Sequence, residues 1–64
     1  MEKNSNKINY YISTKKWTGG VTINKEGIII NACPIAKKWI GQDINTLIDY
    51  YKNKNLLLKA IPLI

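Results

Sequence analysis

The sequence predicts a small α+β domain, a three- to four-stranded antiparallel sheet with one main helix in the order β-β-β-α-β. Two patterns predict it: apolar residues alternate with a period of two in the first half of the chain, and they recur at helical spacing over residues 44–52. The length of 64 residues suits a single domain with a thin core, since a domain of this size hides only roughly 60% of its unfolded surface. We expect this domain over residues 8–64, after a disordered polar tail of residues 1–7.

Alternation predicts three strands, over residues 8–13, 17–24 and 28–32. Asn24 and Gly27 bracket the turn between the second and the third, because Asn favours the start of a type I turn and Gly supplies the positive φ of the bulge that follows. One face of such a sheet needs a helical lid. The apolar residues expected to share that face are Ile8, Tyr10, Ile12, Trp17, Val21, Ile23, Ile28 and Ile30.

Two helical segments are expected to form the lid. Pro34 suits a first helical position and Gly41 suits a position just past a helix end, so a short helical segment is predicted between them. The main helix, residues 44–52, follows Asp43 as its N-cap. The residues expected to face inward are Ile35, Trp39 and Ile40 from the short segment and Ile44, Leu47, Ile48 and Tyr51 from the main helix.

A fourth strand is predicted over residues 56–61, with Pro62 confined to its end or to a sheet edge. Large apolar residues fall on both sides of this strand. It is therefore expected either to be a central strand covered on both faces or to meet a second subunit, which makes a homodimer one predicted partnership. An open strand edge also offers a place for strand addition by a target protein.

The composition predicts a binding protein and not an enzyme. The chain has no histidine, one cysteine and four carboxylates, so it lacks most of the groups used for proton transfer, nucleophilic attack and metal ligation. Cys33 has no histidine to act as its base, and Asp43 and Asp49 point to different sides of a helix. No catalytic residue, metal site or cofactor is expected. The apolar runs are too short to span a bilayer, so we expect a cytoplasmic protein with no membrane partner.

The charge predicts an acidic partner. Ten lysines against four acids give a net charge of +6, which suits a protein, a nucleoprotein complex or nucleic acid. Arginine is absent while isoleucine (twelve) and asparagine (eight) are abundant; this is typical of an AT-rich genome, so codon bias accounts for part of the lysine content. Because arginine is the usual bidentate reader of guanine, the sequence disfavours sequence-specific DNA recognition.

Six residues are the candidate contacts: the lysines would steer the encounter with an acidic surface, and the aromatic rings would anchor it. The alternative for the lysines is a solvated basic surface on which they form no single patch. The alternative for Trp39 is that its ring packs into the core. The candidates are Lys15, Lys16, Lys37, Lys38, Trp39 and Tyr50.

Several short motifs resemble those of small uncharacterised proteins encoded in bacteriophage genomes. They are YYISTKKWT at residues 10–18, GII at 27–29, PI at 34–35 and WIGQ at 39–42. The resemblance implies a mobile-element origin and lends no catalytic residue. By analogy with small phage proteins that bind and block a host factor, it implies a protein that inhibits or modulates a factor of the host cell, as anti-defence and anti-CRISPR proteins do. The alternative function is sequence-tolerant binding of single-stranded nucleic acid by lysines and ring faces.

Overall fold

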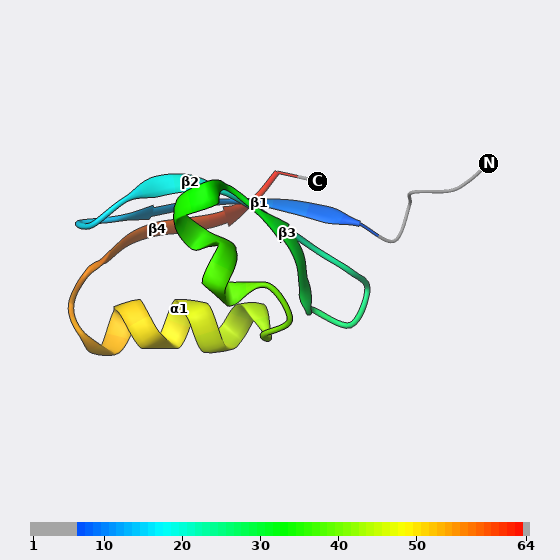
Figure 1. Ribbon diagram of the computed structural model, residues 1–64. Helices are drawn as coiled ribbons and strands as arrows, with labels where there is room; N and C mark the ends of the chain where they lie inside the picture. Colours follow the sequence, from blue (N-terminus) through cyan, green and yellow to red (C-terminus); the bar gives the residue numbers. More distant parts are fainter. Residues whose placement is uncertain (1–6, 64) are drawn as a thin grey trace.

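The computed structural model describes residues 7–63, and within them the predicted α+β fold is confirmed. Four strands form one antiparallel sheet in the order β3-β2-β1-β4. The main helix lies across one face of the sheet, the short helical segment lies beside the third strand and reaches toward the main helix, and no described element covers the other face (Figure 1). The elements are β1 (Ile8–Thr14), β2 (Thr18–Ile23), β3 (Ile29–Ala32), the 3-10 helix η2 (Pro34–Trp39), α1 (Ile44–Asn53) and β4 (Leu57–Pro62). Apart from Lys7, the predicted disordered tail lies outside the described residues.

A buried threonine shapes the turn between β1 and β2. The Oγ1 of Thr14 accepts from the backbone N–H groups of Lys16 at 3.1 Å and Trp17 at 2.9 Å. The same hydroxyl donates to the carbonyl oxygen of Trp17 at 2.8 Å. Because one side chain bonds this many backbone groups of the turn, Lys15 and Lys16 are held in a fixed place at one end of the sheet, with their side chains in solvent.

The turn between β2 and β3 forms as the sequence predicts. The Oδ1 of Asn24 accepts from the N–H of Glu26 at 2.9 Å and from that of Ile28 at 3.0 Å. Gly27 has a φ of +83°, a conformation that L side chains adopt only at a cost. This turn lies at the opposite end of the sheet from Lys15.

The core lies between the sheet and the two helical segments. The predicted stripe of α1 is confirmed, since Ile44, Leu47 and Tyr51 are buried. The predicted N-cap is also confirmed, because Oδ1 of Asp43 accepts from the N–H of Asn45 at 2.7 Å. The buried apolar residues are Ile12, Trp17, Val21, Ile23, Ile29, Ala36, Ile44, Leu47 and Tyr51.

The prediction for the inward face of β3 is wrong. Ile29 is buried and Ile30 is exposed, whereas the alternation put Ile28 and Ile30 inside. The strand pairing shifts by one residue here, which leaves Ile30 without a partner on β2 as the extra residue of a bulge. A one-residue shift reverses which side chains face the core. At the start of β1, Ile8 is also exposed, contrary to the prediction.

The prediction for the short helical segment is also wrong in part. Ile35 and Ile40 are exposed, and Ala36 is buried in their place. The segment is a 3-10 helix, in which side chains three positions apart lie above one another. Ala36 and Trp39 therefore face the core together, and Trp39 is half-buried.

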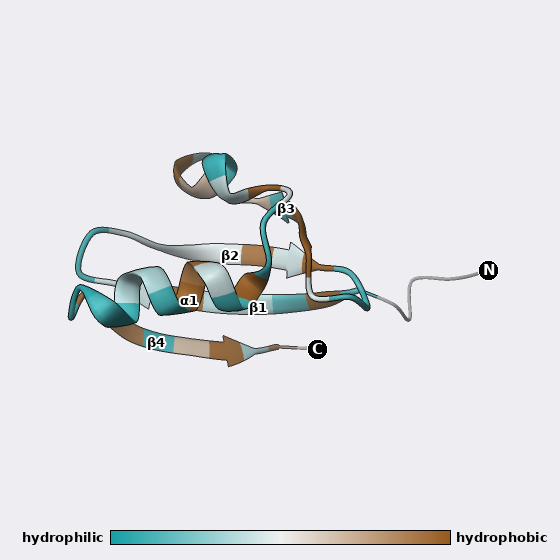
Figure 2. Cartoon of the chain, turned by 90° about the horizontal axis from the view of Figure 1, so that it is seen from below, coloured by the Kyte–Doolittle hydropathy of each residue, from teal (hydrophilic) through white to brown (hydrophobic). Residues whose placement is uncertain are grey.

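β4 is an edge strand, so the predicted alternative of a central strand is wrong. Pro62 stands at the end of this edge strand, as predicted. Figure 2, drawn from the side of α1, shows β4 as the outermost strand, with apolar residues along it. Among the described residues, no helix has the length and apolar character needed to cross a bilayer.

Candidate binding surface

Three of the six predicted contact residues meet at one depression on the surface. Lys38 and Trp39 reach it from the end of η2, Tyr50 from α1, and Gln42 from the connection between these two elements. The depression has a volume of about 230 Å³ and is open to solvent. We call these four residues the aromatic depression.

Ring packing fixes the aromatic depression in place. Trp39 and Tyr50 meet edge to face with ring centroids 5.3 Å apart, and Tyr50 meets Tyr51 in the same way at 4.9 Å. Tyr51 in turn packs on Trp17, with a centroid distance of 5.8 Å, and its hydroxyl accepts from the Trp17 Nε1 at 3.0 Å. Edge-to-face pairs of this kind are each worth about 0.5–1.5 kcal/mol beyond the area that they bury. The exposed ring of Tyr50 is therefore connected to the core through buried rings.

Trp39 carries an unpaired donor. Its Nε1 is buried and has no hydrogen-bond partner, and within residues 7–63 no other buried side-chain nitrogen or oxygen shares this property. A buried donor with no acceptor costs about 1–3 kcal/mol. The residue that bears this cost is one of those that form the aromatic depression.

Lys54 extends the aromatic depression. Its Nζ lies 5.1 Å from the centroid of the Tyr50 ring, within the range of a cation–π interaction. Neither Lys54 nor Gln42 is among the six predicted contact residues. The four-residue spacing of Tyr50 and Lys54 along a helix is a signal that could have found Lys54, whereas the sequence around Gln42 holds no such signal.

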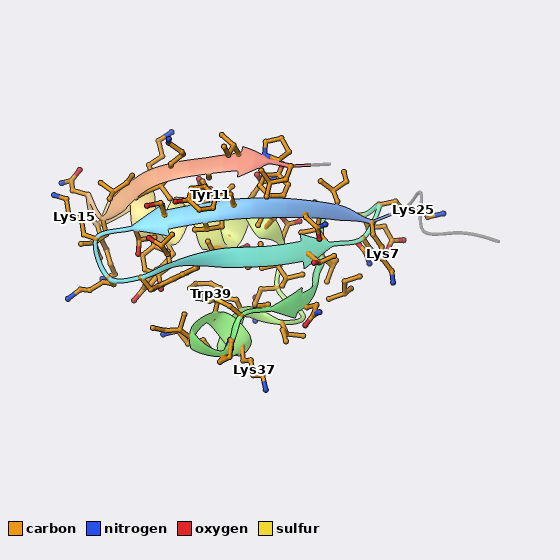
Figure 3. All side chains as sticks on the ribbon, turned by 90° about the horizontal axis from the view of Figure 1, so that it is seen from above. Lys7, Tyr11, Lys15, Lys25, Lys37 and Trp39 are labelled. Atoms are coloured by element: carbon orange, nitrogen blue, oxygen red, sulfur yellow. The ribbon has the colours of Figure 1, made fainter. Side chains whose placement is uncertain are left out.

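The predicted contacts Lys15 and Lys16 lie elsewhere, in the turn between β1 and β2. The Lys15 N–H donates to the carbonyl oxygen of Leu56 at 2.8 Å, so this turn touches the connection between α1 and β4. Lys52 and Lys54 belong to the end of α1 that leads into that connection. We call this group of four lysines (15, 16, 52 and 54) the basic end; it is the left end of the molecule in Figure 1, and Lys15 marks it in Figure 3.

Lys37 lies neither in the aromatic depression nor at the basic end. Figure 3 shows its side chain pointing away from the body of the protein, on the outer side of η2. Lys7 and Lys25 lie at the end of the sheet opposite Lys15. The predicted contact residues are therefore divided between the aromatic depression, the basic end and one isolated lysine.

Two of the three described carboxylates lie away from the basic end, whereas Asp49 lies on α1, three residues before Lys52. Glu26 belongs to the turn between β2 and β3, and Asp43 is bridged to Ile28 just after that turn. Both carboxylates are thus at the opposite end of the sheet (Figure 1). The end of the sheet opposite Lys15 therefore mixes Lys7 and Lys25 with two carboxylates, whereas the basic end gathers four lysines.

Within residues 7–63, no group of three or more His, Cys, Asp or Glu side chains has an arrangement that holds a metal ion. The thiol of Cys33 is half-buried against Gly19, where a Cβ would lie 2.5 Å from the sulfur. No protein family model matches the chain, and no curated protein or solved structure matches it either.

Proposed function

We propose that the protein is a non-enzymatic binding protein that inhibits or modulates a host factor by covering an acidic site on its surface. The observation that carries the proposal is the meeting of Lys38, Trp39 and Tyr50 at the aromatic depression, next to Lys54. The partner would be a host protein or a nucleoprotein complex.

The arrangement supplies both parts of a protein interface. Lys38 and Lys54 lie beside the exposed ring of Tyr50, so a carboxylate of the partner would meet a cation next to an aromatic surface. Tyrosine and tryptophan are among the residues that most often contribute a large share of the binding energy of a protein interface. Lysines mainly raise the rate of encounter with an anionic surface. Because the rings of Trp39 and Tyr51 already hold the Tyr50 ring in place, little side-chain freedom is lost on binding.

The proposed class of partner has a separate support. The resemblance of several motifs to those of small phage-encoded proteins favours a factor of the host cell, including a component of its defence. An anti-defence or anti-CRISPR role in the host cytoplasm is part of the proposal. The anti-defence role rests on the resemblance to small phage-encoded proteins, whereas the aromatic depression supports only the proposed mode of binding.

A capture experiment tests the proposal. The tagged chain is incubated with nuclease-treated bacterial lysate, alongside Lys38→Glu, Tyr50→Ala and the control Lys25→Glu. The control makes the same charge change at the end of the sheet opposite Lys15, away from Trp39. We expect one defined partner whose affinity falls about tenfold or more with the two depression variants, since a lost anchor costs at least about 1.4 kcal/mol. The control variant should capture it like the wild type. Equal capture by all four chains, or none by the wild type, contradicts the proposal.

A second candidate function rests on the basic end. The four lysines that gather there come from two elements distant in the sequence, and such a cluster favours sequence-tolerant binding of single-stranded DNA or RNA. Binding of a fluorescent oligonucleotide should then weaken with salt with a log–log slope of about −3, the value for four neutralised phosphates on a single strand. No binding at low salt rules this candidate out.

A further inference from the structure

The two edges of the sheet differ in how their backbone groups are bonded. On β3, the Ile29 N–H donates to the carbonyl oxygen of Gln42, and the Ile29 carbonyl oxygen accepts from the N–H of Gly41, both at 2.8 Å. Further along, the Ala32 N–H donates to the side-chain Oδ1 of Asn31 at 2.9 Å. These bonds occupy the outward N–H and C=O of Ile29 and the outward N–H of Ala32, which protects this edge against pairing with another strand.

Within residues 7–63, nothing covers the outer edge of β4 in this way (Figure 2). The Leu63 N–H donates to the carbonyl oxygen of Asn9 at 2.6 Å. Since bonded pairs alternate along an antiparallel ladder, this bond means that the N–H and C=O of Ala60 point away from β1. Pro62 occupies the next outward position and has no N–H to donate to a strand on that side, so an added strand would find its bonding groups at Ala60.

Apolar side chains surround the free backbone of Ala60. Leu58, Ile61 and Leu63 are all exposed, although each is a large apolar residue. Lys59 is the only charged residue of β4. An uncovered edge strand with clustered apolar side chains is a site where another strand adds.

We propose that β4 pairs antiparallel with β4 of a second copy of the chain, around a two-fold axis at Ala60. The Ala60 N–H of each copy then donates to the Ala60 carbonyl oxygen of the other, and the two four-stranded sheets become one. In this register Lys59 lies opposite Ile61 of the second copy and not opposite its own counterpart. The pairing therefore brings no like charges face to face.

The placement of charge favours a second copy over a strand of an acidic protein. β4 carries one lysine and otherwise uncharged side chains, so its edge offers little to attract an anionic strand. β4 also begins at the basic end (Figure 1), and antiparallel pairing places the basic ends of the two copies at opposite ends of the joint sheet. A chain with so thin a core gains stability from the apolar surface that such pairing buries.

Light scattering and amide exchange test the proposal on the whole chain. As the concentration rises from low micromolar to millimolar, the mass should increase from 7.3 kDa toward twice that value. Exchange of the Ala60 amide should slow over the same range, whereas the Ile61 amide, which faces β1 by the same alternation, should be slow throughout.

A pair of matched variants separates the effect of disturbing the β4 edge from the effect of adding a positive charge. Ile61→Lys and Ile40→Lys each add one lysine, at positions that are 43% and 42% exposed, but Ile40 lies at the end of η2. Ile61→Lys should raise the dimer dissociation constant by about tenfold or more, and Ile40→Lys should leave it unchanged. Ala60→Pro, which removes only an outward N–H, should be monomeric yet melt cooperatively. A chain that stays at 7.3 kDa at millimolar concentration, or equal effects of the two lysine variants, overturns the proposal.

Discussion

Tyr51→Phe tests the link between the sheet and the aromatic depression. The Tyr51 hydroxyl accepts from the Trp17 Nε1 at 3.0 Å, and both side chains are buried. Phenylalanine keeps the ring but leaves the indole N–H without an acceptor, which costs about 1–3 kcal/mol. We expect the free energy of unfolding to fall by about 2 kcal/mol, which lowers the Tm by roughly 8–16 °C in a domain of this size.

Urea unfolding followed by circular dichroism measures this loss without relying on tryptophan fluorescence. Tyr50→Phe is the matched control, because it removes a hydroxyl from an exposed tyrosine of the same helix and should change the stability by less than about 0.5 kcal/mol. Adding Trp17→Phe to Tyr51→Phe removes the unpaired donor too, so the two losses should not add. If Tyr51→Phe is as stable as Tyr50→Phe, the reasoning about the buried bond is refuted.

Three further predictions concern thermal unfolding. Gly19→Ala should destabilise by about 1–3 kcal/mol, because its Cβ would lie 2.5 Å from the Cys33 sulfur; adding Cys33→Ala should restore most of the loss, and no restoration contradicts the steric cause. Thr14→Val should cost about 1–3 kcal/mol by removing the bonds that hold the turn, whereas Thr18→Val, at an exposed position, should be near neutral. Asp43→Ala should cost about 1 kcal/mol through loss of the N-cap, and a wild-type Tm would argue against it.

The parts of the fold that sequence reasoning found are those fixed by local chemistry. The stripe of Leu47 and Tyr51 and the N-cap at Asp43 depend on neighbours within one or two turns of the same helix. The sequence predicted the wrong buried face for β3 because the bulge at Ile30 depends on contacts with residues distant in the sequence. The Ile29 backbone bonds to the connection after η2. The alternation of apolar residues within a four-residue strand cannot predict these bonds or the change of register that accompanies them.

The candidate surface divides in the same way. Lys38, Trp39 and Tyr50 were selected by residue type, and they meet because η2 packs beside α1. Lys15 was selected with them but lies at the basic end, since the turn that carries it bonds to Leu56, which follows α1. Contacts between residues so far apart in the chain depend on the packed fold and cannot be read from spacing.

The indole signals of the two tryptophans test the central claim, binding through the aromatic depression, most directly. Trp39 lies in the depression, and Trp17 is buried with its Nε1 bonded to Tyr51, so the two N–H resonances report on the surface and on the core of one molecule. Upon titration with the captured partner, we predict that the Trp39 resonance shifts or broadens while that of Trp17 stays in place. An unchanged Trp39 resonance at saturation, with changes elsewhere on the protein, would contradict the account.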